Sequence, residues 1–136
     1  MLLLDTHAVL WLAWGTPMAP AALAAIAQAR TTGDVLVSPV SAWEIATLAS
    51  TGRIVLGQEP VIWLQRFVAQ PGVRLAPLTL EAAARSAFLP APPFHGDLAD
   101  RMLVATALEL GLTLVTRDDR ITVWAATSAA LGVIGA

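Results

Sequence analysis

The chain has 136 residues, a length typical of one domain with its own hydrophobic core, so we expect residues 1–136 to form one domain. Its sequence contains neither cysteine nor lysine, which excludes disulfide bonds, cysteine-ligated zinc, thiol catalysis and a Walker-type phosphate loop. The net charge of −2 does not indicate a general nucleic-acid-binding protein.

Hydrophobic residues make up 57% of the chain and charged residues only 13%, which is more apolar than an average domain. We expect a partner to cover part of this apolar surface, and a second copy of the chain is the first candidate. The longest apolar run, residues 18–27, is about half as long as a membrane-spanning helix and contains Pro20. The first residues lack the basic segment of a signal peptide and reach an acid at Asp5. We therefore expect a cytoplasmic protein without a membrane segment.

Short apolar runs alternate along the chain with stretches of helical character. In chain order we expect a strand at 2–4, a helix at 19–30, a strand at 35–37, a helix from 39 to about 50, a helix at 60–70, a strand at 73–75, helices at 79–89 and 98–110, and strands at 113–115 and 133–134. The strands at 73–75 and 133–134 have the weaker signals. This alternation is typical of βαβ units, so the sequence predicts an α/β fold with a parallel sheet covered by helices on both faces.

Two aspartates lie just after predicted strands. Asp5 follows the strand at 2–4, and Asp118 lies three residues beyond the strand at 113–115. Because functional sites in open α/β sheets form at the carboxyl ends of the strands, we expect both acids at the same edge. Each is also a suitable N-cap for a helix that follows it, and its position alone does not distinguish these two roles.

Glu44 lies within the predicted helix at 39–50. On the helical wheel it falls among the bulky residues Val40, Trp43 and Leu48, which we expect to face the core. An unpaired carboxylate is costly to bury, so Glu44 requires a counterion. An arginine is one candidate for that counterion, and a metal ion is the simpler explanation.

Asp97 and Asp100 stand at the start of the predicted helix at 98–110 and share one of its faces. Asp97 is a suitable N-cap for this helix. An acid at position 100 is favoured by the helix dipole, so local structure alone could account for both residues.

Four acids together indicate a metal site. Asp5, Glu44, Asp100 and Asp118 come from four different elements, three of them near predicted strand ends. Converging carboxylates repel one another and raise each other's pKa, which a hard divalent cation such as Mg²⁺ relieves. We take these four as the candidate metal-binding and catalytic residues, with Asp97 as an additional candidate ligand. An ion held in this way activates a water and neutralises charge on a phosphodiester, so phosphate-ester hydrolysis is the expected chemistry.

Several polar residues adjoin the candidate ligands. Thr6 and Thr116 could orient the acids or the attacking water, or could cap helices. Arg101 and Arg117 could pair with the acids or hold a phosphate, and arginine suits both roles. His95 lies in a proline-rich loop beside the expected site and is a candidate for substrate contact.

Four segments of the chain, taken in order, form a recognisable series. They are residues 3–11 (LLDTHAVLW), residues 41–46 (SAWEIA) followed by 51–54 (TGRI), residues 95–107 (HGDLADRMLVATA), and residues 114–118 (LVTRD). This series resembles the motifs of PIN-domain toxins of the VapC type, and it extends over residues 2–121. Each motif alone is weak, whereas four in the same order are specific.

The resemblance implies a three-layer α/β/α fold with a short parallel sheet of four or five strands. It implies an endoribonuclease that depends on Mg²⁺ or Mn²⁺ and leaves 5′-phosphate and 3′-hydroxyl ends on RNA. It also implies a toxin of a type II toxin–antitoxin pair that is inhibited by a cognate antitoxin and forms a homodimer. Asp5, Glu44, Asp100 and Asp118 match the acidic ligands of the family, and Asp97 matches a position that is frequently acidic.

Two other functions are alternatives. A haloacid dehalogenase-type phosphatase also places an aspartate after its first strand, but it needs a second aspartate where this chain has His7, and a downstream lysine. A catalytically silent module that only binds a partner is the other alternative. The complete acid set argues against it, because a silent scaffold has no need of Glu44 within an apolar stripe.

Overall fold

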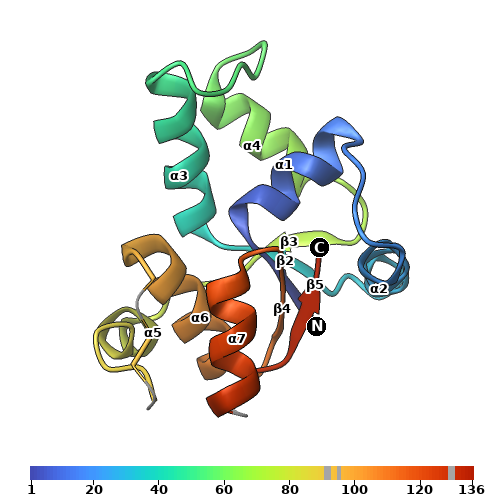
Figure 1. The fold of residues 1–136 in the computed structure, drawn as a ribbon. Coiled ribbons are helices and arrows are strands. Elements are labelled where there is room, and N and C mark those ends of the chain that lie inside the picture. Colours follow the sequence, from blue (N-terminus) through green and yellow to red (C-terminus); the bar gives the residue numbers. More distant parts are fainter. Residues whose placement is uncertain (91–92, 95, 129–130) are drawn as a thin grey trace.

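The computed structural model describes residues 1–90, 93–94, 96–128 and 131–136 (Figure 1). The elements are, in chain order, β1 (Leu2–Leu4), α1 (Thr6–Trp14), α2 (Pro20–Arg30), β2 (Val35–Val37), α3 (Pro39–Ser50), α4 (Pro60–Val68), β3 (Val73–Leu75), α5 (Leu80–Arg85), α6 (Leu98–Leu110), β4 (Thr113–Thr116), α7 (Asp119–Ser128) and β5 (Val133–Gly135). None of these described helices is long and apolar enough to cross a membrane.

The strands form one parallel sheet in the order β3–β2–β1–β4–β5. The central strand β1 pairs with β2 on one side and with β4 on the other, so that Leu4 lies opposite both Val37 and Val115. Because all strands run the same way, their carboxyl ends meet at one edge of the sheet. The residues that follow Leu4 and Val115 therefore lie side by side at this edge, where α/β proteins form their sites.

Helices cover both faces of the sheet, as the alternation of strands and helices predicts (Figure 1). Leu2 and Leu4 of β1 belong to a core shared with α1, α2, α3 and α4. Leu3 belongs to a second core, shared with α6 and α7. Every residue of β1 and β2 is buried, because these strands have a helical layer on each side. The expected three-layer α/β/α fold with a short parallel sheet is confirmed.

The predicted strands and most predicted helices agree with the structure to within two residues. The structure adds α1 and α7, which begin immediately after two of the proposed ligands, Asp5 and Asp118. The predicted helix at 79–89 is wrong in length, because α5 ends at Arg85. Beyond Ser86 the amides of Ala87 and Phe88 donate to carbonyls only three residues back. The chain then leads to Pro90, which disfavours helical conformation in the preceding residue.

Candidate metal centre

The register of the sheet, with Leu4 opposite Val115, brings Asp5 to Thr116 at the carboxyl ends of β1 and β4. Only 8% of Asp5 is exposed. Its Oδ1 accepts a hydrogen bond of 2.8 Å from the amide of Ala8 and caps α1, while its Oδ2 accepts one of 2.5 Å from the hydroxyl of Thr116. Burial raises the pKa of the Asp5 carboxyl, and the hydrogen bond from Thr116 opposes this rise. Asp5 is therefore both a helix cap and a buried carboxylate at the sheet edge.

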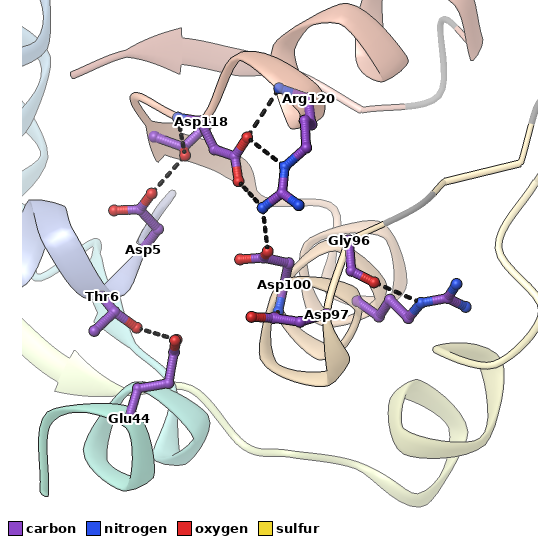
Figure 2. A network of polar contacts seen from close by, with 10 residues as sticks. Asp5, Thr6, Glu44, Gly96, Asp97, Asp100, Asp118 and Arg120 are labelled. Atoms are coloured by element: carbon purple, nitrogen blue, oxygen red, sulfur yellow. Dashed lines mark hydrogen bonds and ion pairs between the residues drawn. The ribbon is translucent and has the colours of Figure 1, made fainter. Parts of the chain in front are cut away.

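Asp118 lies at the same edge, after the end of β4. Its amide donates to the hydroxyl of Thr116 at 3.0 Å, and its Oδ1 accepts a bond of 2.8 Å from the amide of Arg120. The side chain of Arg120 folds back toward it, with 3.0 Å between Nη2 and Oδ2 of Asp118 (Figure 2). Partial burial raises the pKa of Asp118, but the hydrogen bonds and charge of Arg120 outweigh this effect and lower the pKa overall. Asp118 is therefore ionised at neutral pH.

Glu44 comes to the site from the second turn of α3. Its Oε1 accepts a hydrogen bond of 2.5 Å from the hydroxyl of Thr6, a buried residue that directly follows Asp5. Ser41, about one turn earlier on α3, is fully buried, and its hydroxyl lies 3.2 Å from that of Thr6. The small serine allows α3 to approach the start of α1 closely. Burial raises the pKa of Glu44, and the hydrogen bond from Thr6 opposes this rise.

The expected orientation of α3 is wrong at Trp43, whose side chain is 61% exposed. Val40 is buried as expected and Leu48 packs against the core, while Ser41 and Ile45 complete the buried face in place of Trp43. Because this buried face runs through Ser41, Glu44 lies at its border and is half-buried rather than enclosed by bulky side chains. The hydrogen bond that partners its carboxylate comes from a threonine hydroxyl.

Asp97 and Asp100 lie at the amino end of α6. Asp97 caps the helix, since its Oδ1 accepts a hydrogen bond of 2.9 Å from the amide of Asp100. Burial, together with the charges of Asp97, Asp118 and Glu44, raises the pKa of Asp100 to about 7. A shift with these causes means that several carboxylates share one site, and a cation placed among them would relieve it.

The acids of the sequence prediction line one cavity of about 390 Å³. The described residues that line it are Asp5, Thr6, His7, Trp11, Glu44, Asp97, Asp100, Leu103, Arg117, Asp118 and Arg120. Half of the ten acidic residues of the chain gather here, against two arginines. This excess of negative charge favours the binding of a cation.

The other polar residues predicted for the site have different positions. Arg117 lines the cavity, and its guanidinium lies 4.3 Å from the centre of the Trp11 ring. Arg101 instead donates from Nε to the carbonyl of Gly96 at 2.9 Å, and it is not among the described residues that line the cavity. His95 lies outside the described residues. Of the two arginines predicted from the sequence, only Arg117 reaches the site.

Arg120 joins two of the acids and was not among the residues predicted from the sequence. Its Nη2 lies 3.2 Å from Oδ2 of Asp100 and 3.0 Å from Oδ2 of Asp118. The sequence did contain a signal for its contact with Asp118. Arg120 lies two residues after this aspartate, in the first turn of α7, where side chains lie near the residue that caps the helix. The contact with Asp100 has no such local signal, since it depends on the packing of α6 beside α7 (Figure 1).

The donor chemistry of the cavity fits Mg²⁺ or Mn²⁺, which prefer carboxylate oxygens and keep several water ligands. Among residues 1–90, 93–94, 96–128 and 131–136, no three acidic or histidine side chains stand as a ready-made set of ligands. Two of the candidates, Asp100 and Asp118, are paired with Arg120 instead. The residues therefore fit a divalent cation in donor type and charge, while a cationic side chain already contacts two of them.

Comparison with known proteins relates this site to a family. The family model of the PIN domain matches residues 2–126. The chain belongs to the PIN-domain family. It is 36% identical over 119 residues to Ribonuclease VapC22 of Mycobacterium tuberculosis (strain ATCC 25618 / H37Rv), and the match covers 88% of each protein. The resemblance to VapC-type proteins, first seen in four short motifs, is thereby confirmed, and the haloacid dehalogenase alternative is excluded.

Solved structures share this PIN fold at lower sequence identity. VapBC2 from Rickettsia felis, bound to a DNA fragment from its promoter, contains a chain with a TM-score of 0.70 and 12% identity, and the match covers 98% of this chain and 97% of that one. FitAcB from Neisseria gonorrhoeae contains a chain with a TM-score of 0.63 and 22% identity, with coverages of 98% and 96%. At such identities the likeness shows the fold alone.

Proposed function

We propose that this PIN-domain protein is a divalent-metal-dependent endoribonuclease and the toxin of a type II toxin–antitoxin pair. The gathering of Asp5, Glu44, Asp100 and Asp118 from four elements in one cavity carries the proposal. A relative that is 36% identical is named a ribonuclease. The proposed substrate is RNA in the cytoplasm, cut to leave 5′-phosphate and 3′-hydroxyl ends.

In this proposal Asp5, Glu44, Asp100 and Asp118 hold Mg²⁺ or Mn²⁺. The bound ion supplies positive charge at the scissile phosphate and lowers the pKa of water, which makes hydrolysis possible at neutral pH. Asp97 supports the set by capping α6 and thereby ordering the turn that carries Asp100.

Two threonines position the proposed ligands. The hydroxyl of Thr116 donates to Asp5, and the hydroxyl of Thr6 donates to Glu44. Both threonines are buried, so each hydroxyl holds its carboxylate in one orientation. Orientation of this kind contributes to metal affinity alongside the identity of the ligands. Arg117, at the cavity wall, is the proposed contact for the RNA backbone.

We assign the exposed apolar surface to protein partners, namely a cognate antitoxin and a second copy of the chain. Trp43 and Leu98 are each 61% exposed, and they flank an apolar pocket of about 230 Å³ between α3 and α6. Contiguous apolar surface of this kind is unusual on a protein that works alone. Light scattering after size-exclusion chromatography tests the homodimer, and co-purification with the protein encoded next to it tests the antitoxin. A monomeric mass by light scattering, together with no co-purifying protein, would contradict this assignment.

Cleavage of RNA in the presence of Mg²⁺ tests the proposed activity. Mixed cellular RNA is incubated with the wild-type chain, with Asp5→Asn, and with the wild-type chain in EDTA. We expect cleavage only by the metal-loaded wild type, with fragments whose 5′ ends accept direct ligation because they carry phosphate. Cleavage that persists in both controls would exclude this metal centre. Absence of cleavage in a protein that still binds Mn²⁺ would instead favour the catalytically silent module.

A further inference from the structure

The guanidinium of Arg120 occupies the point where two proposed ligands meet (Figure 2). Its Nε lies 3.3 Å from Oδ1 of Asp118, and its Nη2 lies 3.0 Å from Oδ2 of the same residue. The same Nη2 lies 3.2 Å from Oδ2 of Asp100. One cationic nitrogen is thus shared by the Oδ2 atoms of two carboxylates, and a divalent cation held by these residues would need carboxylate oxygens that this nitrogen already contacts.

The two carboxylates are more buried than the arginine that pairs with them. The side chain of Arg120 is 61% exposed, whereas those of Asp100 and Asp118 are 18% and 23% exposed. The guanidinium therefore approaches the pair from the solvent side and can leave without repacking of the core. Ion pairs with such an exposed partner contribute little to stability, so a divalent cation can compete for the same oxygens.

Contacts other than the guanidinium also hold the two aspartates at the site. The backbone amide of Arg120 donates to Oδ1 of Asp118 at 2.8 Å, and this bond does not depend on the side chain. Asp100 lies in the first turn of α6, whose cap is the side chain of Asp97. The backbone of both aspartates is thus fixed at a helix start, and the side chain of Arg120 is the most exposed member of the cluster.

We propose that Arg120 competes with the divalent ion for Asp100 and Asp118, and that it binds a phosphate of the RNA once the ion has displaced it. Without the ion the guanidinium pairs with both acids and offsets part of their negative charge. When the ion takes this role, Arg120 loses its partners at the wall of the cavity, which Arg117 also lines. A planar guanidinium then binds phosphate oxygens through two parallel hydrogen bonds. The phosphate contact rests on the proposed ribonuclease function, whereas the competition for the acids does not.

Calorimetric titration of Mn²⁺ into the full-length protein tests the competition. The samples are the wild type, Arg120→Ala, and Arg66→Ala as a control that removes the same charge from the exposed side of α4, outside this cavity. Arg120→Ala removes a guanidinium that competes for the carboxylates and also repels Mn²⁺. We therefore expect this variant to bind Mn²⁺ about three- to tenfold more tightly than the wild type. We expect Arg66→Ala to bind like the wild type. Equal or weaker binding by a folded Arg120→Ala variant would overturn the competition.

Cleavage kinetics at saturating Mn²⁺ test the phosphate contact. We expect Arg120→Ala to raise KM for RNA by about tenfold with a smaller change in kcat, because the lost contact binds the backbone rather than the reacting water. Arg120→Lys should restore part of the affinity, since a lysine keeps the charge without the planar pair of donors. An unchanged KM in Arg120→Ala would overturn this role. If the wild type cleaves no RNA, the proposed function and the phosphate contact fail together, while the Mn²⁺ titration still decides the competition.

Discussion

The hydroxyl of Thr116 lies 2.5 Å from Oδ2 of Asp5, although the two residues are 111 positions apart in the sequence. The oxygen of the same hydroxyl accepts a hydrogen bond of 3.0 Å from the amide of Asp118. One fully buried threonine thus connects two of the proposed metal ligands. The connection exists because β1 and β4 are neighbouring parallel strands whose register places Leu4 opposite Val115. The residues that follow, Asp5 and Thr116, are therefore close enough to form a hydrogen bond.

Replacing Thr116 with valine removes this hydroxyl and keeps the shape of the side chain. The free energy of unfolding should fall by about 1–3 kcal/mol, because a buried carboxylate oxygen loses its donor. The pKa of Asp5 should rise further, since the bond from Thr116 lowers it. Affinity for Mn²⁺ should fall by about 10- to 100-fold, as for other residues that orient metal ligands. Urea unfolding and calorimetry measure these effects, and Thr116→Ser should behave like the wild type. A valine variant with unchanged metal affinity would refute the positioning role.

The two roles of Asp5 can be separated by comparing asparagine with alanine. Asparagine caps a helix as well as aspartate does, so Asp5→Asn should keep the cap of α1. Its single oxygen cannot also accept the bond from Thr116, and removal of a buried charge offsets this loss, so we expect the variant to unfold near the wild-type urea concentration. Asp5→Ala removes the cap of α1 and should cost about 1 kcal/mol. Both variants should lose RNA cleavage. Retained cleavage in Asp5→Asn would show that the carboxylate is not needed.

Stability in the presence of EDTA should depend on pH through Asp100. Its pKa is about 7 in the folded protein and near the ordinary value of 3.8 in the unfolded chain. Between these values the folded state holds a proton that the unfolded state has released. The stabilisation linked to this proton is therefore complete below pH 3.8 and is lost as pH rises through about 7.

Asp100→Asn should flatten this part of the pH profile, as measured by urea unfolding from about pH 4 to about pH 8. The raised pKa values of Asp5 and Glu44 act in the same direction, so some slope should remain. The lowered pKa of Asp118 acts only at more acidic pH, where its stabilisation is lost as pH falls. A wild-type profile that is flat over this range, or the same slope in Asp100→Asn, would contradict the shared-carboxylate site.

The role of Asp97 can be tested with the same pair of substitutions. Its Oδ1 caps α6, so Asp97→Asn should keep stability and Asp97→Ala should lose about 1 kcal/mol. The charge of Asp97 raises the pKa of Asp100, and Asp97→Asn should therefore lower that pKa. Cleavage should persist in Asp97→Asn if the residue acts as a cap. A loss of Mn²⁺ affinity in Asp97→Asn, measured by calorimetry, would make Asp97 a ligand instead.

Local features of the fold and of the site could be predicted from the sequence alone. The alternation of strands and helices indicates the α/β class, because hydrophobic periodicity is a property of neighbouring residues. The caps at Asp5 and Asp97 are where the sequence predicts them, since each side chain bonds an amide three residues further on. The meeting of Asp5 and Asp118 at one edge also follows from such local evidence, combined with the rule that parallel strands end together. The grouping of Glu44, Asp97 and Asp100 with them was indicated by the family motifs.

The neighbours of these acids were decided only by the tertiary structure. Trp43 was expected in the core and is exposed, because the rotation of α3 is set by its packing through Ser41, and one residue along a helix turns the face by about 100°. The contact of Arg120 with Asp100 depends on where α6 lies beside α7. Which acids exist and which helices they cap is local chemistry, determined by the sequence itself. Strand register and helix packing decide which cation pairs with the acids and which hydroxyl bonds to Asp5. Register and packing are set by the free energy of the whole fold and not by neighbouring residues alone.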